Sequence, residues 1–400
     1  MVEWKPIEDL GPYFGGLTGK TKDDFVDGNA KFITYMNVFT NPSLDVSTTG
    51  VVRINKGERQ NRIQKGDILF TGSSETPEEA GMSCVVTDEL NDDYYMNSFC
   101  FGIRLNQPEQ YNLGYLKHIL RSFNIRKEIA KSASGVTRFN ISKARFGKIR
   151  IPIPSLSEQQ RIVDILDTFT SSIENLKEQI ALRRKQYEYY RDQLLDIEGK
   201  DGVEWKSIDE IKRSLKTGLN PRQNFKLNTS TAEFPYITGK DIYNNQINIS
   251  DNTDKIDAAA ISIINKRACL EKGLLLFAST GCGTVGRMAI IKDYNHDWAI
   301  SETLYAIKFI SDILPDYVMQ CLYANYIKKQ YEPKISRGSV PHLKVADLLK
   351  VNIPIPSIIE QQRIVSILDT FEASIANLEA QLAQREKQYE YYRNKLLTFE

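Results

Sequence analysis

Two long stretches of the chain carry apolar residues at alternating steps of four and three, the spacing of a helix face that packs along another helix. The first series continues to Leu194 and the second to Leu396, and Arg183 and Arg385 are their polar members. Helices of globular domains average about three turns, so series this long favour a coiled-coil seam over an amphipathic helix buried in its own domain. The predicted seam and partner-contact positions are Ile162, Leu166, Phe169, Ile173 and Leu176, and Ile364, Leu368, Phe371, Ile375 and Leu378.

These helical stretches lie in a sequence repeat with a constant offset of 202 residues. Residues 151–198 and 353–400 are identical at 33 of 48 positions. Each copy opens with I-P-I-P-S, and the two prolines prevent a helix from beginning earlier. A helix of about 40 residues is about 60 Å long at 1.5 Å per residue. The constant parts of the chain therefore predict two long, closely similar helices.

The blocks that precede each repeat differ strongly from each other and mix short strand-like runs with a closing helical pattern. The predicted fold class is α/β (α+β), with two globular domains separated by a long antiparallel two-helix coiled coil in a pseudo-two-fold internal repeat. The helices are antiparallel because the first ends just before the second block begins, so the second must run back. The predicted segments are 1–154 and 199–356 for the globular domains, and 155–198 and 357–400 for the spacer helices.

Composition narrows the class of protein. The 400 residues include 52 Lys and Arg against 51 Asp and Glu, a net charge of +1, which excludes a protein that is basic throughout. Five isolated cysteines and three histidines provide no local zinc-ligand cluster, and single cysteines are typical of a reducing cytoplasm. No apolar run approaches the roughly 20 residues of a membrane-spanning helix. We expect a cytoplasmic protein without membrane contact.

Charge is segregated inside the first block. Residues 113–150 contain ten Lys and Arg and one acid, whereas residues 71–99 contain seven acids and no base. We expect the basic helix and loop to face DNA and the acidic segment 75–93 to face away from phosphate. Arg, Asn, Ser and Thr can read base edges and Lys can bind phosphate. The candidate DNA-binding residues are Ser134, Thr137, Arg138, Asn140, Lys143 and Arg145 in the first block, and Lys334, Arg337, Ser339, His342 and Lys344 in the second.

Short motifs do not indicate catalysis. GCGTVG at 281–286 has the spacing of a dinucleotide-binding loop, but the strand-like RMAIIKD follows where a helix is required. We therefore interpret it as a tight turn between strands. FGGLTGKT at 14–21 lacks the first glycine of a phosphate-binding loop, and we find no catalytic constellation.

The doubled I-P-I-P-S-x-x-E-Q-Q-R-I-V-x-I-L-D-T-F, with the alternation of variable and constant blocks, resembles the specificity subunit of type I restriction–modification systems. The resemblance implies a non-catalytic subunit whose two target recognition domains each read one half of a bipartite, asymmetric site in double-stranded DNA. It implies that the helix pair sets the spacing between the halves. Two methyltransferase subunits would dock on the helices and domains, and two motor-nuclease restriction subunits can join. S-adenosylmethionine, ATP and Mg²⁺ would belong to those partners, and this chain would hold no cofactor.

Two other classes stay open on the residues alone. One is a coiled-coil protein–protein adaptor that joins two binding domains without DNA readout. The other is an enzyme in its own right, which the missing motifs disfavour. Because the two variable blocks differ in sequence, the resemblance predicts that the two half-sites differ as well, whereas identical blocks would read a palindrome.

Overall fold

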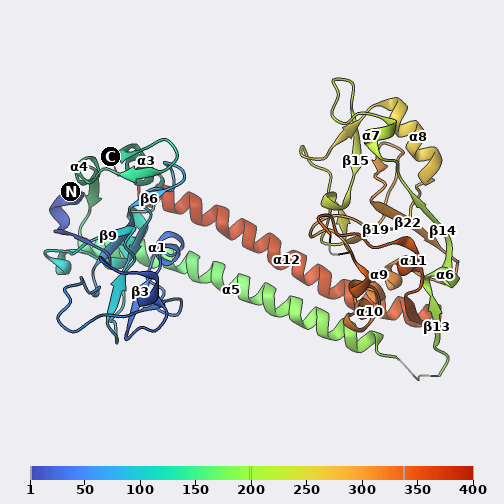
Figure 1. Cartoon of the computed structure of the whole chain (residues 1–400), viewed down its shortest axis with the longest axis horizontal. Coiled ribbons are helices and arrows are strands. Elements are labelled where there is room, and N and C mark those ends of the chain that lie inside the picture. Colours follow the sequence, from blue (N-terminus) through green and yellow to red (C-terminus); the bar gives the residue numbers. More distant parts are fainter. Residues whose placement is uncertain (1, 198, 200, 337, 400) are drawn as a thin grey trace. The chain divides into compact units, whose positions relative to one another are not determined.

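The computed structural model describes residues 2–197, 199, 201–336 and 338–399. The chain divides into two compact units, one formed by residues 1–177 and 380–400 and the other by residues 178–379. Each unit therefore holds one mixed α/β domain together with part of both long helices, α5 (Leu156–Leu195) and α12 (Ile358–Leu396) (Figure 1). Among the described residues, no helix has the length and apolar character needed to cross a membrane.

The two long helices confirm the helical interpretation of the repeat, and their contacts are antiparallel within each unit. In the first unit Lys177 pairs with Glu386, with 3.6 Å between Nζ and Oε1. In the second unit Arg184 pairs with Glu379 at 2.5 Å. Phe169 contacts Tyr392 in the first unit and Tyr190 contacts Phe371 in the second. Within each unit, the contact farther along α5 thus falls earlier on α12, which is the register of an antiparallel pair.

The polar members of the predicted seam have a specific partner. In the first unit Tyr392 stacks on Phe169 at 5.2 Å between ring centroids, and the guanidinium carbon of Arg385 lies 5.6 Å from the same ring. An arginine over an aromatic face is attracted by the ring quadrupole while its charge stays hydrated at the helix surface. The second unit repeats this arrangement with Phe371, Tyr190 at 5.3 Å and Arg183 at 6.0 Å.

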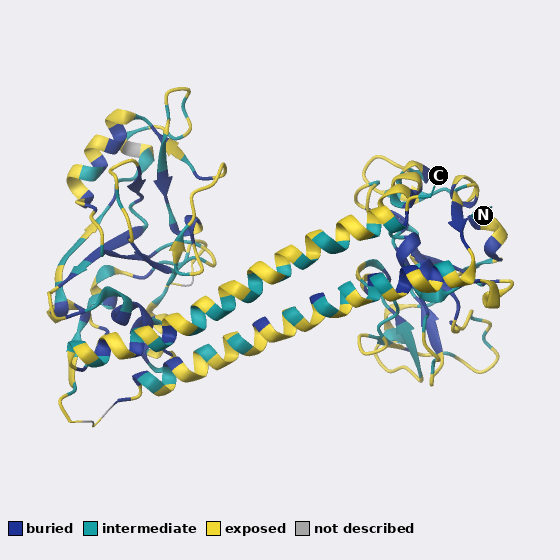
Figure 2. Cartoon of the chain, turned by 180° about the vertical axis from the view of Figure 1, so that it is seen from behind, coloured by how far each residue is buried: buried dark blue, intermediate teal, exposed yellow. Residues whose placement is uncertain are grey.

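Burial along the predicted seam is uneven. Ile162 and Leu166 are fully buried in the core of the first domain, and Ile364 and Leu368 are fully buried in the core of the second. Each helix thus begins as part of its own domain. Farther along, most residues of both helices are half-buried or exposed (Figure 2). Ile173 is buried, and the half-buried members are Phe169, Leu176, Phe371, Ile375 and Leu378.

The first domain contains small sheets, as the short strand-like runs predict. A four-stranded antiparallel sheet has the order β2 (Tyr13–Gly15), β9 (Cys100–Ile103), β5 (Ile68–Thr71), β7 (Ser83–Val85). The other sheets are β4 (Gly50–Val52), β3 (Ala30–Ile33), β8 (Tyr94–Met96); β10 (Ala133–Ser134), β11 (Phe139–Ile141), β6 (Ser73–Ser74); and β1 (Glu3–Pro6), β12 (Arg150–Ile153). The helices are α1 (Tyr35–Thr40), α2 (Leu113–Ile119), α3 (Phe123–Ser132) and α4 (Lys143–Gly147).

The second domain repeats this plan with different residues. Its four-stranded sheet has the order β14 (Lys212–Thr217), β22 (Leu304–Phe309), β19 (Leu275–Ala278), β20 (Met288–Ile290). The other sheets are β18 (Lys255–Ile256), β15 (Phe234–Ile237), β21 (Ala299–Ile300); β16 (Ile242–Tyr243), β17 (Gln246–Ile247); and β13 (Glu204–Ser207), β23 (Asn352–Ile355). The helices are α6 (Ile208–Ile211), α7 (Pro221–Asn224), α8 (Ala258–Ala268), α9 (Pro315–Tyr323), α10 (Asn325–Tyr331) and α11 (Val345–Leu349).

A buried glutamine joins each domain to its long helix. Gln159 donates from Nε2 to the carbonyl of Pro154 at 2.8 Å, and its Oε1 accepts from the backbone N–H of Asn112, the residue that caps α2. The hydroxyl of Tyr115 donates to the carbonyl of Pro152 at 2.8 Å. The same contacts recur 202 residues later in Gln361, Pro356, Leu314, Tyr317 and Pro354. One glutamine side chain therefore links three elements in each unit: the end of β12, α2 and α5 in the first, and the end of β23, α9 and α12 in the second.

Gln361→Leu tests this link. Gln361 is fully buried and also donates to the carbonyl of Asp312 at 3.0 Å, so the leucine leaves one backbone N–H and two carbonyls without their partner. We expect a loss of about 2–3 kcal/mol in unfolding free energy, seen as a lower calorimetric midpoint. Gln362→Leu, one residue along on the exposed face, is the matched control and is expected to change stability by less than about 0.5 kcal/mol. Equal midpoints for the two variants would contradict the link.

Candidate nucleic-acid interface

In the first unit, four of the candidate DNA-binding residues lie on one hairpin. β10 and β11 pair so that Ser134 faces Asn140, and Thr137 and Arg138 lie in the loop between the strands. All four side chains are exposed. β11 also pairs with β6, where Asn140 faces Ser73, so the hairpin is attached to the domain by its second strand. The structure thus brings a short polar, basic loop together on one sheet edge.

The other two candidates of this unit lie on α4, directly after the hairpin. Lys143 is exposed, and its Nζ lies 5.3 Å from the ring centroid of the buried Phe101. Arg145 is exposed and reaches the carbonyl of Ala133 at 3.5 Å. Both bases adjoin the hairpin, and Lys143 also covers the edge of the aromatic core.

The corresponding loop of the second unit is held more tightly. His342 occupies the position of Asn140 in the repeat, and its Nδ1 lies 2.8 Å from the hydroxyl of Thr280. The backbone N–H of His342 donates to the hydroxyl of Ser336 at 3.0 Å. Ser339 is exposed, as are Lys334 and Lys344, while Arg337 lies outside the described residues.

The GCGTVG segment supports this loop, a role that the sequence analysis missed. It is the turn between the antiparallel strands β19 and β20, as expected, and positive φ angles at Gly281, Gly283 and Gly286 shape it. The N–H of Gly281 donates to the carbonyl of Pro341 at 3.0 Å, and Thr280 bridges to His342. The motif therefore positions the candidate loop. The glycine spacing of the motif indicated the turn. It could not indicate that Thr280, at the start of the turn, pairs with His342, about 60 residues later.

Two arginines of the basic helical region, Arg121 and Arg126, are bound inside the first domain and do not belong to a free basic surface. Arg121 is held inside the first domain by the carbonyls at the end of α1 and by that of Ser83, and burial lowers its pKa to about 10. Arg126 donates to the carbonyls of Glu78, Ala80 and Gly81, with the same lowering of its pKa to about 10 by burial. These two arginines neutralise backbone dipoles.

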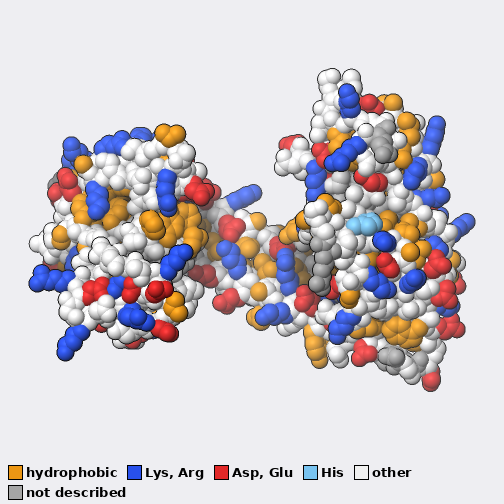
Figure 3. All heavy atoms as spheres, viewed as in Figure 1, with side chains coloured by type: hydrophobic (Ala, Val, Ile, Leu, Met, Phe, Trp, Pro, Cys, Tyr) orange, Lys and Arg blue, Asp and Glu red, His pale blue; other side chains and the backbone are white. Residues whose placement is uncertain are grey.

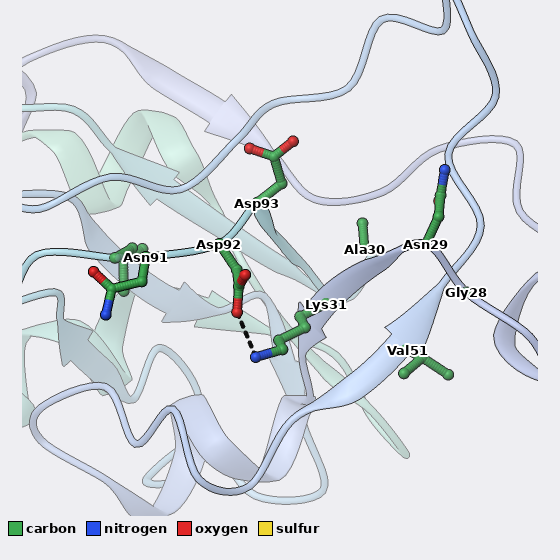
Figure 4. A pocket seen from close by; sticks show the side chains of 9 residues that line it. Gly28, Asn29, Ala30, Lys31, Val51, Asn91, Asp92 and Asp93 are labelled. Atoms are coloured by element: carbon green, nitrogen blue, oxygen red, sulfur yellow. Dashed lines mark hydrogen bonds and ion pairs between the residues drawn. The ribbon is translucent and has the colours of Figure 1, made fainter.

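The acidic segment makes contacts within its own domain. Its first part lies against α3, where Arg126 donates to the carbonyls of Glu78 and Ala80. Its second part pairs with bases of the same domain: Asp92 with Lys31 at 2.5 Å and Asp93 with Arg62 at 2.8 Å. Lys31 and Asp92 face each other in a hollow of about 590 Å³ beside β3 (Figure 4). On the face drawn in Figure 3, basic and acidic side chains are interspersed over both units.

Equivalent carboxylates on the two long helices have opposite surroundings. Asp167 accepts from Lys117 and His118, each at 2.7 Å; burial alone would raise its pKa, but these hydrogen bonds lower it to about 2. Asp369 is its counterpart on α12. It lines a hollow of about 430 Å³ with Asp316 and Glu372, and burial, followed by these two carboxylates, raises its pKa. Within the described residues, no group of three or more His, Cys, Asp or Glu is arranged to hold a metal ion.

Comparison with known proteins identifies relatives along the whole chain. Residues 1–183 and 200–386 match the family model of the type I restriction modification DNA specificity domain. The specificity subunit of the Escherichia coli type I restriction enzyme EcoR124I/EcoR124II is 33% identical over 273 residues, and the chain spans 63% of that subunit's length. A candidate type I specificity subunit of Haemophilus influenzae is 31% identical over 318 residues, 74% of each chain.

A solved structure has the same fold. The S subunit of a type I restriction–modification system from M. genitalium aligns with a TM-score of 0.56, covering 100% of this chain and 97% of that one. Its sequence identity is 16%, so this likeness bears on the fold alone.

The two carboxylates predict opposite effects of one substitution. A raised pKa means that the folded state disfavours the ionised form, so Asp369 contributes stability at low pH that is lost as the pH rises through its pKa. Asp369→Asn should therefore raise the free energy of unfolding at pH 7. The gain should be less than about 1 kcal/mol because the carboxylate is only partly buried and solvent screens it, and it should vanish near pH 4. Asp167→Asn, the matched variant, should lower the midpoint at pH 7. Shifts of the same sign would contradict these assignments.

Proposed function

Because the chain belongs to the type I restriction–modification DNA specificity family, we propose that it is the sequence-recognition subunit of such a complex. Each globular domain reads one half of a bipartite DNA site. The observation that carries this proposal is the pair of loops, 134–140 and 336–342, which occupy equivalent positions of the repeat and present different side chains. Different loops on equivalent frames are suited to an asymmetric site.

The helix pair serves as the spacer between the half-sites. The two helices contain 40 and 39 residues and have no internal proline or glycine. Contacts to the domain cores at the helix ends couple helix length to the position of each loop. The domain division proposed for this role is 1–154 and 199–356 for recognition, with 155–198 and 357–400 as spacer.

The partners are two methyltransferase subunits. The constant helices present the same exposed aromatic residue twice, Tyr189 in one unit and Tyr391 in the other, at 61% and 60% exposure. Repeated exposed aromatics are suited to two copies of one partner, since tyrosine is enriched at protein interfaces. In this proposal the chain works in the cytoplasm and is itself non-catalytic. S-adenosylmethionine, ATP and Mg²⁺ are held by the methyltransferase and by two further restriction subunits.

Methylome sequencing tests the function. A host that expresses the chain with its methyltransferase is expected to carry methylated adenines in a bipartite motif with two unlike halves and a constant gap. Native mass spectrometry of the purified complex should give one copy of the chain to two methyltransferases. A complex that assembles but leaves the genome without a sequence-specific mark would favour the adaptor class. Methylation by the purified chain alone would show that it is an enzyme.

Deleting one heptad from each helix tests the spacer. Removing residues 176–182 and 378–384 keeps the 3.5-residue seam in phase and shortens each helix by about 10 Å, or about three base pairs of DNA. We expect a motif with the same two halves and a shorter gap. The control replaces 176–182 by a copy of 378–384, which preserves length and should preserve the gap. An unchanged gap in the deletion variant would contradict the spacer role.

A further inference from the structure

An exposed aromatic ring and an arginine form a pair at the candidate interface of the first domain. Phe99 lies in the turn between β8 and β9 and is 56% exposed, which is unusual for a phenylalanine in a folded domain. The guanidinium carbon of Arg138 lies 5.3 Å from the centroid of this ring, within the range of a cation–π contact. The two residues come from segments 39 positions apart in the sequence.

Backbone hydrogen bonds through Gly72 hold the two segments together. The N–H of Gly72 donates to the carbonyl of Phe99 at 2.7 Å, and its own carbonyl accepts from the N–H of Ile141 at 3.0 Å. A Cβ at Gly72 would lie 2.8 Å from the carbonyl oxygen of Phe99, so a side chain at this position would force the backbone to shift. The N–H of Phe99 also donates to the side chain of Asn97 at 2.8 Å. The Phe99 side chain thus projects from a hydrogen-bonded turn beside the hairpin that carries Arg138.

The donors of Arg138 remain available for a ligand. In the part of the chain that the structure describes, Arg138 forms no hydrogen bond or ion pair with another residue, unlike the internal Arg121 and Arg126. A ring below a guanidinium restricts its rotamers and leaves the edge that carries the N–H groups open. That edge matches the O6 and N7 acceptors of guanine in the major groove, the commonest base-specific contact of arginine.

At the two equivalent positions, the described residues of the second domain are neither arginine nor aromatic. Val340 occupies the position of Arg138 in the repeat. Thr303 occupies that of Phe99, because its carbonyl accepts from the N–H of Ser279 as the carbonyl of Phe99 accepts from Gly72. The guanidinium–aromatic pair is therefore a property of the first recognition loop and not of the shared scaffold.

We propose that Arg138 recognises a guanine in the half-site of the first domain and that Phe99 is the positioning residue that holds its guanidinium. This assignment rests on the proposed function and adds to it one base identity and the residue that reads it. Apolar contact of the exposed Phe99 edge with a neighbouring thymine methyl group fits the same geometry.

The test measures how 7-deazaguanine substitutions in the DNA change the affinity of the natural chain and of its variants. The assembled methyltransferase complex binds a duplex carrying its methylome-defined site, and 7-deazaguanine, which lacks the N7 acceptor, replaces each guanine in turn. With the natural chain, one position should lose affinity by about 10-fold or more. With Arg138→Ala, binding of the natural duplex should fall similarly, and 7-deazaguanine at that one position should cause no further loss.

Three further variants separate base recognition and the role of the ring from a general effect of charge. Phe99→Leu should weaken the coupling to the same guanine, and Phe99→Tyr should restore it because the ring is retained. Lys143→Ala should lower affinity for natural and modified duplexes equally, as a phosphate contact does.

The outcomes are distinct. If Arg138→Ala stays as sensitive as the natural chain to every 7-deazaguanine, the assignment is overturned, although the chain still reads DNA. If the natural complex shows no preference for its site over unrelated DNA, the proposed function itself fails.

Discussion

The hydrogen bond from a buried glutamine amide to the carbonyl of the preceding proline is the contact on which the rest of each unit depends. Gln159 and Gln361 each sit in the first turns of a long helix and reach back five residues. Their carbonyl oxygens also accept the N–H that begins the closing helix of the domain. The strand, the domain helix and the long helix therefore meet at one side chain. Because that side chain is buried, the loss of any of its partners would leave a polar group without a hydrogen bond.

That constraint explains why residues 151–198 are repeated at 353–400 while the preceding blocks differ. The glutamine and tyrosine contacts that join each domain to its long helix recur 202 residues apart, whereas the hairpin 134–140 and the loop 336–342 have different residues and different supports. The first loop is an open hairpin with a guanidinium over an exposed ring, and the second is held on a glycine turn through His342. A constant scaffold that carries two unlike loops supports the proposal that the two domains recognise different half-sites.

The sequence predicted the helices, their direction and the mixed domains because a 3.5-residue period and a long exact repeat are local signals. It could not explain Arg183 and Arg385, since their aromatic partners depend on the register between two helices. It could not show that Arg121 is internal, because the carbonyls that hold this side chain come from α1, about 80 residues earlier. Phe99 had no sequence signal at all. Its significance arises from Gly72 and Arg138, which only the folded chain brings beside it.

The central claim is that the repeated helices carry exchangeable variable blocks and that each block determines one half-site. The most direct measurement is the methylome of a host expressing the methyltransferase with a chain in which residues 2–150 replace residues 203–352, so that the first variable block stands in both positions. The account predicts a palindromic motif, in which the first half-site appears twice in inverted orientation across the original gap. An unchanged asymmetric motif, or two copies in direct orientation, would contradict it.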